Sequence, residues 1–383
     1  MKPIRVLMII DRYHPVWGGA ENQLKQLLPH FRAHGIDCSV VTRRWKKTWR
    51  KKDVFDATPV TRLGAAGVTK LHDVLYAFHL FVYLLFRTDS YTCFHSHGAI
   101  LLGALTTLAA RLRGKKSVVK IASSTKIPAL RRRLAGKLLL QVCRLSSTIV
   151  AVSNEIRAEL HDAGIDQKRI ALIPNGVDHR RFAPATTYER FAFRKAHGLD
   201  RNHIIAVFCS RLVRGKGIEV LMDAWKLVEQ NRSLNATLFI LGDDYMQNNA
   251  VAHEIRGYAS HHLKHVRFEG AVKRPEVYLN HADLFIFPSQ REGCPNALLE
   301  AMAGENTCIA SRIGGNIDLI DNECGLLFEP DDAEQCADQI IKVLSHMRQY
   351  RPKAAAARKK VYRHNSFQKI SSQYNTLYRE LLK

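Results

Sequence analysis

The stretch Ala282–Ala303, ADLFIFPSQREGCPNALLEAMA, indicates how this chain folds. Its apolar run Leu284–Phe287 has the length and composition of a buried strand in a parallel sheet. A loop follows from Pro288 to about Asn296, and apolar residues then recur at helical spacing. Strand, loop and helix in this order build doubly wound α/β domains, whose ligands bind beyond the carboxyl ends of the strands.

Two carboxylates flank the start of the expected helix. Glu292 lies in the loop and Glu300 on the helix, eight residues apart. The free N–H groups at a helix N-terminus attract a phosphate. A loop carboxylate can accept hydrogen bonds from the hydroxyls of a sugar, and a helical one from a ribose. The alternative is that the two glutamates have no common function and lie on a surface loop and an exposed helix. The surrounding strand, loop and helix favour a nucleotide-sugar site instead.

Two further turns have the character of phosphate sites. Ile204–Ser210 predicts a buried strand, and Arg211 and Lys216 then flank a glycine-containing turn before a helix. Two cations and free N–H groups at one strand end would bind a diphosphate. Ile4–Ile10 predicts the first strand of the chain, and Gly18-Gly19-Ala20-Glu21 follows it before another helix. Surface cations and ordinary turn glycines are the alternatives.

These motifs resemble those of the retaining glycosyltransferases of family four. E-G-C-P-N-A-L-L-E-A-M-A at 292–303 is similar to the E-x7-E signature, and the spacing of Arg211 and Lys216 is similar to the R-x4-K pair of the family. The resemblance spans nearly the whole chain and implies the GT-B fold, with two doubly wound, Rossmann-like α/β domains facing a cleft. The expected domains are 1–180 for the acceptor and 181–365 for the donor. Residues 366–383 are expected to form a helix that packs back on the first domain.

The resemblance also implies a role for each motif residue. Arg211 and Lys216 would neutralise the leaving diphosphate of a nucleotide-diphospho-sugar. Glu292 would orient the sugar, so these three residues are the expected catalytic group, and Glu300 would bind the ribose. The other expected donor-binding residues are Gly18, Gly19, Gly293, Asn296, Ala297 and Leu298. Asp243-Asp244 could suggest a metal site, but the family needs no protein-bound metal, so neither a metal nor a cofactor is expected.

The chain departs from the family pattern on the acceptor side. Many relatives end one strand with T-x-H-G, whose histidine lies beside the reacting carbon of the sugar, and by position Ala122 replaces that histidine here. Ser123, Ser124 or Lys120 is expected to contact the sugar instead, and Ser123 is assigned to the acceptor side. His95 and His97, two apart on a strand, share a face, but no third metal ligand lies close by, so no metal site is expected there. The resemblance implies a histidine pair near the interdomain cleft and so assigns His97 to the acceptor side, with a hydrogen-bonded structural histidine as the alternative. A GT-B protein that binds sugar or lipid without transferring it therefore stays an alternative.

The charge of the chain is large and uneven. The net charge is +23, of which residues 1–180 contribute +18 and residues 181–383 contribute +5. Ser90–Asn154 contains 11 basic residues and no acidic one. Such a field attracts an anionic surface or a polyanion. The basic run Arg43–Lys52, with its two tryptophans, suits a membrane interface, a solvated loop or a single nucleic-acid strand.

The segment Pro128–Leu145 predicts a basic amphipathic helix. Its leucines at 130, 134, 138 and 145 cluster on one side with Val142 and are expected to pack inward, leaving the arginines to face a membrane. We therefore expect an anionic membrane surface as a partner. A basic nucleic-acid-binding protein, supported by the charge alone, remains the other class.

The cysteine pattern and the hydropathy of the chain indicate where in the cell the protein is expected. The eight cysteines include no C-x-x-C pair, which suits core residues in a reducing compartment. The N-terminus leads directly into a strand, which predicts no signal peptide. The longest nearly uncharged apolar run, Val74–Phe86, has 13 residues and is too short to span a bilayer. We expect a cytoplasmic enzyme at the inner membrane face. It would add sugar to a glycan or lipid-linked acceptor in cell-surface polysaccharide or glycolipid synthesis.

Overall fold

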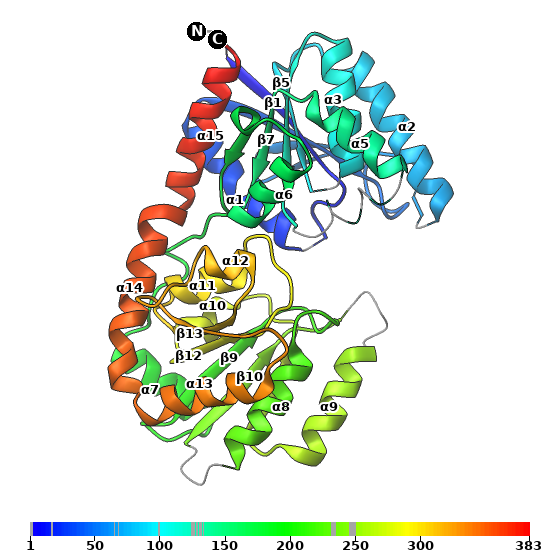
Figure 1. Cartoon of the computed structure of the whole chain (residues 1–383). Coiled ribbons are helices and arrows are strands. Elements are labelled where there is room, and N and C mark those ends of the chain that lie inside the picture. Colours follow the sequence, from blue (N-terminus) through cyan, green and yellow to red (C-terminus); the bar gives the residue numbers. More distant parts are fainter. Residues whose placement is uncertain are drawn as a thin grey trace. The chain divides into compact units, whose positions relative to one another are not determined.

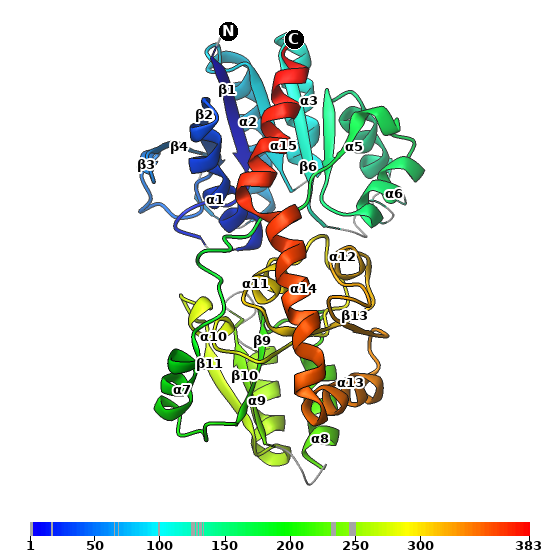
Figure 2. The same cartoon turned by 90° about the vertical axis from the view of Figure 1, so that its left-hand side faces the viewer.

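The structure is a computed structural model that forms two compact units (Figures 1 and 2). The first comprises Met1–Gly176 with Phe367–Lys383, and the second Val177–Ser366. Each contains one sheet between helices. The structure describes residues 3–16, 18–64, 66–67, 69–98, 100–123, 127, 129, 132, 134–230, 235–244 and 250–383.

The sheet of the first unit has the strand order β3-β4-β2-β1-β5-β6-β7-β8. Its strands pair in parallel, apart from the antiparallel pair of β3 and β4. The order reverses between β1 and β5, which is the switch point where doubly wound sheets bind ligands. The strands are β1 Ile4–Ile10, β2 Ile36–Arg43, β3 Lys52–Phe55, β4 Thr58–Leu63, β5 Cys93–His97, β6 Lys116–Ile121, β7 Thr148–Ala151 and β8 Ile170–Leu172.

Alternate side chains of β1 enter two different cores. Val6 and Met8 pack with α1 and α15 on one face, whereas Leu7 and Ile9 pack with α2 and α3 on the other. A strand buried on both faces has to be apolar throughout, as this run is. The helices of this unit are α1 Gly19–Ala33, α2 Lys70–Phe86, α3 Ile100–Leu112, α5 Leu134–Arg144, α6 Asn154–Asp162, the 3-10 helix Gln167–Arg169 and α15 Phe367–Leu381.

The C-terminal helix α15 is part of the core of the first unit. Phe367, Ile370, Tyr374 and Tyr378 are buried there against α1. The Tyr378 hydroxyl lies 2.5 Å from Nδ1 of His95 on β5. The last helix of the chain thus completes a domain that begins at the N-terminus.

The second unit contains a wholly parallel sheet of order β11-β10-β9-β12-β13-β14. The predicted strand Leu284–Phe287 is β12, and it lies beside β9 at the switch point. The other strands are β9 Ile204–Cys209, β10 Ala236–Leu241, β11 Val266–Gly270, β13 Thr307–Ser311 and β14 Leu326–Phe328. The helices are α7 Thr187–Ala196, α8 Ile218–Glu229, α9 Ala250–His262, α10 Glu276–Leu279, α11 Asn296–Ala303, α12 Gly314–Ile317, α13 Ala333–Ser345 and α14 Met347–Asn365. Both units are therefore doubly wound α/β domains, as the strand and helix pattern predicts.

The prediction that the leucines of the basic helix pack inward is wrong. Leu134, Leu138 and Leu145 are exposed, and Gly136, Leu140 and Cys143 face the core of the unit instead. Leu130 lies outside the described residues. The helix α5 packs against α3, where the Cys143 thiol contacts the Ile100 carbonyl oxygen, and in this packing the stripe of Gly136, Leu140 and Cys143 faces inward. In the part of the chain that the structure describes, no helix has both the length and the apolar character to cross a membrane.

Candidate active site

The loop between β9 and α8 lies directly against the loop that follows β12. Gly215 and Gly217 have φ values of +86° and +71°, which side chains other than glycine rarely adopt. A Cβ atom on Gly217 would lie 1.9 Å from the carbonyl oxygen of Pro288. The backbone N–H of Gln290 donates to the Gly215 carbonyl at 3.0 Å. These contacts place the R-x4-K turn beside the Glu292 loop.

Lys216 and Glu292 form an ion pair across these two loops. Lys216 Nζ lies 2.5 Å from Glu292 Oε1, and the two side chains are 21% and 15% exposed. Ser289 Oγ donates to the same carboxylate oxygen at 2.9 Å. Lys216 comes from the loop after β9 and Ser289 from the loop after β12. Because both hold the same oxygen, the contact between these two loops fixes the position of the Glu292 carboxylate.

A small polar network fixes the Glu292 loop to the next strand. Ser311 Oγ, at the end of β13, donates to the Ser289 carbonyl oxygen at 2.5 Å. Asn316 Nδ2 in turn donates to the Ser311 carbonyl oxygen at 2.8 Å. Nothing in the spacing of Ser289, Ser311 and Asn316 marks them as supports of Glu292, because they meet only when the parallel strands align.

Arg211, at the start of the same turn, is exposed. Among the described residues its guanidinium makes no hydrogen bond or ion pair. The guanidinium presents a planar fork of N–H donors, which matches the oxygens of a phosphate. The turn therefore offers one cation held by a carboxylate and one directed to solvent.

Glu300 is half-buried on α11. Burial raises the pKa of its carboxyl to about 8, with nearby Arg181 lowering it and Glu276 raising it. Arg181 itself pairs with Glu276 at 2.8 Å. The charge of Glu300 also raises the pKa of Cys209 at the end of β9, in addition to the effect of burial. Glu300 therefore lies on the helix that the sequence predicts, near Cys209 at the carboxyl end of β9, but spacing alone could not predict its raised pKa.

The remaining residues of the E-x7-E segment differ in accessibility. Gly293 is buried, and a Cβ atom on Gly315 of α12 would lie 2.7 Å from its carbonyl oxygen. Asn296 and Ala297 are half-buried in the first turn of α11, whereas the Leu298 side chain belongs wholly to the core. The Leu298 side chain is thus closed to a ligand, whereas Asn296, Ala297 and Glu300 are partly accessible on α11.

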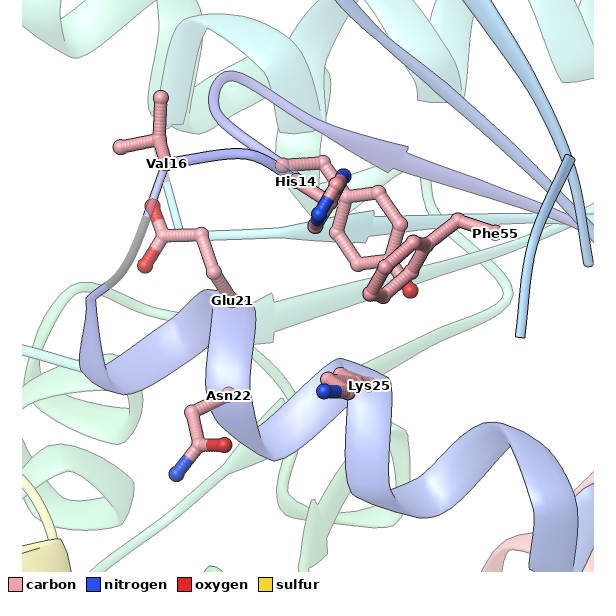
Figure 3. Close-up of a pocket in the computed structure, with 7 residues that line it drawn as sticks. His14, Val16, Glu21, Asn22, Lys25 and Phe55 are labelled. Carbon is pink, nitrogen blue, oxygen red and sulfur yellow. The ribbon is translucent and has the colours of Figure 1, made fainter. Parts of the chain in front are cut away.

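In the first unit, the loop after β1 carries the glycine motif. Gly18 is the N-cap of α1, and a Cβ atom there would lie 2.3 Å from Oε2 of Glu21. A small recess beside the loop is lined by His14, Glu21, Asn22, Lys25 and Phe55, among others (Figure 3). The ring of His14 stacks on that of Phe55 at 3.6 Å between centroids. Gly19 begins the helix, so the backbone of this loop meets the helix N-terminus that the motif predicts.

The candidate acceptor residues lie at the ends of β5 and β6. His97 is 6% exposed and stacks on His95 with 4.3 Å between ring centroids. Burial lowers the pKa of His97 well below its usual value, and His95 and Lys120 lower it further, so the ring is neutral. Its Nε2 is buried and has no hydrogen-bond partner among the described residues. Ser123 is exposed beyond β6, Ala122 is half-buried, and Ser124 lies outside the described residues.

Among the described residues, no three His, Cys, Asp or Glu side chains gather as a metal site would require. Asp243, which follows β10, has Arg256 3.7 Å away. The Asp243-Asp244 pair is therefore partly occupied by a cation of the protein itself.

Comparison with known proteins agrees with this geometry. Residues 17–181 match the profile of the family described as Glycosyltransferase Family 4, and residues 203–346 match that of Glycosyl transferases group 1. The chain therefore carries a family 4 glycosyltransferase domain followed by a group 1 glycosyl transferase domain. The two matched ranges include the R-x4-K turn, the E-x7-E segment and both histidines of β5.

Relatives of this chain include the UDP-Gal:alpha-D-GlcNAc-diphosphoundecaprenol alpha-1,3-galactosyltransferase of Escherichia coli. It is 27% identical over 268 residues, which cover 68% of each chain. The N-acetyl-alpha-D-glucosaminyl L-malate synthase of Bacillus anthracis is 28% identical over 62% of this chain and 61% of its own. A putative teichuronic acid biosynthesis glycosyltransferase of Bacillus subtilis is 28% identical over 55% of this chain and 50% of its own. The matches thus span 50–68% of the length of these relatives.

Solved structures share the fold over nearly the whole length. Anabaena Alr3699/HepE, in complex with UDP and glucose, superposes with a TM-score of 0.81 at 16% identity, covering 98% of this chain and all of the other. WaaG, a glycosyltransferase involved in lipopolysaccharide biosynthesis, gives 0.74 at 16% identity, covering 97% and 99%. The predicted GT-B fold is confirmed.

Proposed function

We propose that the protein is a retaining, metal-independent glycosyltransferase that moves a hexose from a nucleotide-diphospho-sugar to a saccharide or lipid-linked acceptor. The observation that carries this proposal is the ion pair of Lys216 and Glu292 beside the exposed Arg211, at the carboxyl ends of β9 and β12. A fixed carboxylate and two cations within one pair of loops match the needs of a sugar bound to a diphosphate.

The proposed chemistry uses the cations for the leaving group. The bond between the anomeric carbon and the diphosphate oxygen breaks, and the acceptor hydroxyl oxygen bonds to that carbon on the same face. The hydroxyl proton passes to the departing phosphate. Lys216 and Arg211 stabilise the negative charge that grows on the diphosphate, while Glu292 accepts hydrogen bonds from the hydroxyls of the sugar. Positioning and charge stabilisation thus carry the step without an enzymic nucleophile.

The nucleoside is assigned to the start of α11. The Glu300 carboxyl would bind the ribose hydroxyls, while Gly293, Asn296, Ala297 and the Leu298 backbone would supply polar groups to the phosphates. Gly18 and Gly19 keep the role that the resemblance implies, contact with the donor diphosphate. The Escherichia coli relative uses UDP-Gal by name and HepE binds UDP, which favours uridine as the base.

The acceptor is assigned to surface-glycan or glycolipid synthesis. The names of the relatives include a diphosphoundecaprenol-linked acceptor and teichuronic acid synthesis. His97 and Ser123 would lie on the acceptor side. The charge of the first 180 residues supports docking at the inner face of an anionic membrane.

A second candidate is a GT-B protein that binds sugar or lipid without transferring it. The observation that favours it is Ala122, which stands where the family resemblance implies a histidine. Donor turnover separates the two candidates, because a binding protein would release no nucleotide.

The deciding experiment screens UDP-, GDP- and ADP-sugars for binding and for nucleotide release, with and without a membrane lipid extract. A transferase releases nucleotide from one class of donor, and the rate rises with the lipid acceptor. Binding without release from every donor would support the second candidate.

A further inference from the structure

The first unit exposes an unusual number of large apolar side chains on one helical layer. Among the described residues, 18 large hydrophobic side chains are exposed, and 11 of them lie on α2, on α3, on α5 or directly after α5. Figure 1 shows these three helices together over one part of the first unit, and α3 packs against both α2 and α5. We name the exposed side of these helices the apolar face.

Helix α2 supplies the longest stripe of this face. Its exposed apolar residues recur every three or four positions and are 36–69% exposed: Leu71, Val74, Phe78, Val82 and Phe86. At 100° per residue they occupy about a third of the helix circumference. The opposite stripe, with Tyr76, Leu80 and Leu84, is buried in the core. The helix is therefore apolar on its outward side as well as its inward side.

The two neighbouring helices continue the face. Their exposed members are Leu101, Leu108 and Leu112 on α3, and Leu134, Leu138 and Leu145 on or just after α5. Contiguous apolar surface of this kind marks a site of interaction with a protein, a ligand or a membrane.

Cations border this face. Arg87, Arg111, Lys116, Arg132 and Lys137 are exposed on or between the same elements. The acidic residues nearest in sequence are already paired, Asp73 with Arg43 at 2.6 Å and Asp89 with Arg113. The surroundings of the face are thus strongly positive.

A basic cavity of about 400 Å³ adjoins the face at Leu145. Its lining includes Arg111, Lys116 and Arg169 together with Ser147, and it includes no acidic side chain among the described residues. The cavity has the size and charge for an anionic headgroup.

We propose that the apolar face inserts into the interfacial region of an anionic lipid bilayer, with the surrounding cations and the cavity on the lipid phosphates. A helix layer with apolar side chains outward and cations at its border matches the two layers of a membrane surface. A second copy of the chain fits less well, because a two-fold contact through this face would bring two cationic borders together. Membrane insertion would bring the protein to the lipid-linked acceptor of the proposed function, but the insertion itself does not depend on transfer.

The test is cosedimentation of the full chain with phosphatidylcholine vesicles that contain or lack phosphatidylglycerol, without donor or acceptor. The wild type should bind the anionic vesicles, and high salt should weaken the binding without abolishing it. The variant Leu71→Ser/Phe78→Ser/Phe86→Ser should need about tenfold more lipid or more for half-binding. Equal binding of this variant and the wild type, or complete release of the wild type by salt, would overturn the proposal.

A matched control carries three exposed apolar replacements in the second unit, Tyr188→Ser, Phe191→Ser and Leu227→Ser. It should bind vesicles as the wild type does, and both triple variants should keep their thermal unfolding and donor hydrolysis.

A fluorescence measurement adds a direct probe of insertion. The variant Phe78→Trp gains an indole on the apolar face, and brominated lipid should quench the emission that this variant adds to that of the wild type. Added emission that brominated lipid leaves unquenched, or a wild-type dimer that the α2 triple variant converts to a monomer, would overturn insertion and assign the face to self-association. Because these readouts need no sugar, loss of transfer alone would count against the proposed function and not against this face.

Discussion

At the scale of single residues, the ion pair of Lys216 and Glu292 links the turn between β9 and α8 to the loop after β12. Lys216→Ala and Arg211→Ala are each predicted to lower kcat/KM for transfer by about 30- to 1000-fold, or about 2–4 kcal/mol, because one charge-assisted phosphate contact is lost. Initial rates with saturating acceptor measure this. Arg291→Ala, which removes an exposed arginine beside Glu292, is the control and should retain activity. Near-normal turnover of either site variant would contradict the assignment.

Substitution of Glu300 and of Glu292 should affect the affinity for different parts of the donor. Glu300→Gln is predicted to weaken binding of the bare nucleoside diphosphate, because an amide NH2 group replaces one of the two carboxyl oxygens that face the ribose hydroxyls. Glu292→Gln should mainly weaken binding of the nucleotide-sugar and slow transfer. Calorimetric titration with the diphosphate and with the intact donor distinguishes the two. If both variants weakened binding of the bare nucleotide equally, the assignment of Glu300 to the ribose and of Glu292 to the sugar would be wrong.

The raised pKa of Glu300 predicts a pH-dependent stability. The folded protein keeps this proton to about pH 8, whereas the unfolded chain releases it near the ordinary value of 4.5. The contribution of protonated Glu300 to the free energy of unfolding is fully present below pH 4.5. It is lost as the pH rises toward about 8, by at most about 1.4 kcal/mol per pH unit. Glu300→Gln should therefore gain stability relative to the wild type between those values. Denaturant unfolding at several pH values tests this, and a constant difference would refute the assigned shift.

At the scale of elements, the turn between β9 and α8 depends on a glycine that no other residue can replace. Gly217→Ala would put a Cβ atom 1.9 Å from the Pro288 carbonyl at a positive φ, so we predict a loss of about 2–4 kcal/mol in the free energy of unfolding. Gly257→Ala is the matched control, because Gly257 lies inside α9 with open space around it. That change should stabilise by up to about 1 kcal/mol. Equal effects of the two substitutions would show that the close approach of the two loops is not rigid.

At the scale of the whole molecule, the uneven charge predicts salt-sensitive membrane binding. Replacing Arg131, Arg132 and Arg133 together with Ser should weaken binding to anionic vesicles, since each cation near the surface contributes about 1 kcal/mol and the attraction fades within about 8 Å at physiological salt. Arg132 is exposed, and the other two lie outside the described residues. Transfer to a lipid acceptor should fall more than donor hydrolysis does. The control replaces three exposed cations of the second unit, Arg201, Lys342 and Lys359, with Ser. If both triple variants lost binding equally, net charge alone would explain the attraction.

The sequence by itself determined the two α/β units and the positions of the glycine-containing turns after β1 and β9. Strands buried on both faces need unbroken apolar runs such as Leu284–Phe287, and tight turns need glycines such as Gly217, so both features are visible locally. Only the tertiary structure decided the contact of Lys216 with Glu292 and the proton affinity of Glu300, because both depend on which strand ends meet and how much water they exclude. The same holds for Leu134 and Leu138, where the packing of α5 on α3 left one stripe of leucines outside. Periodicity marks an apolar stripe, but the neighbouring helix decides whether that stripe is buried.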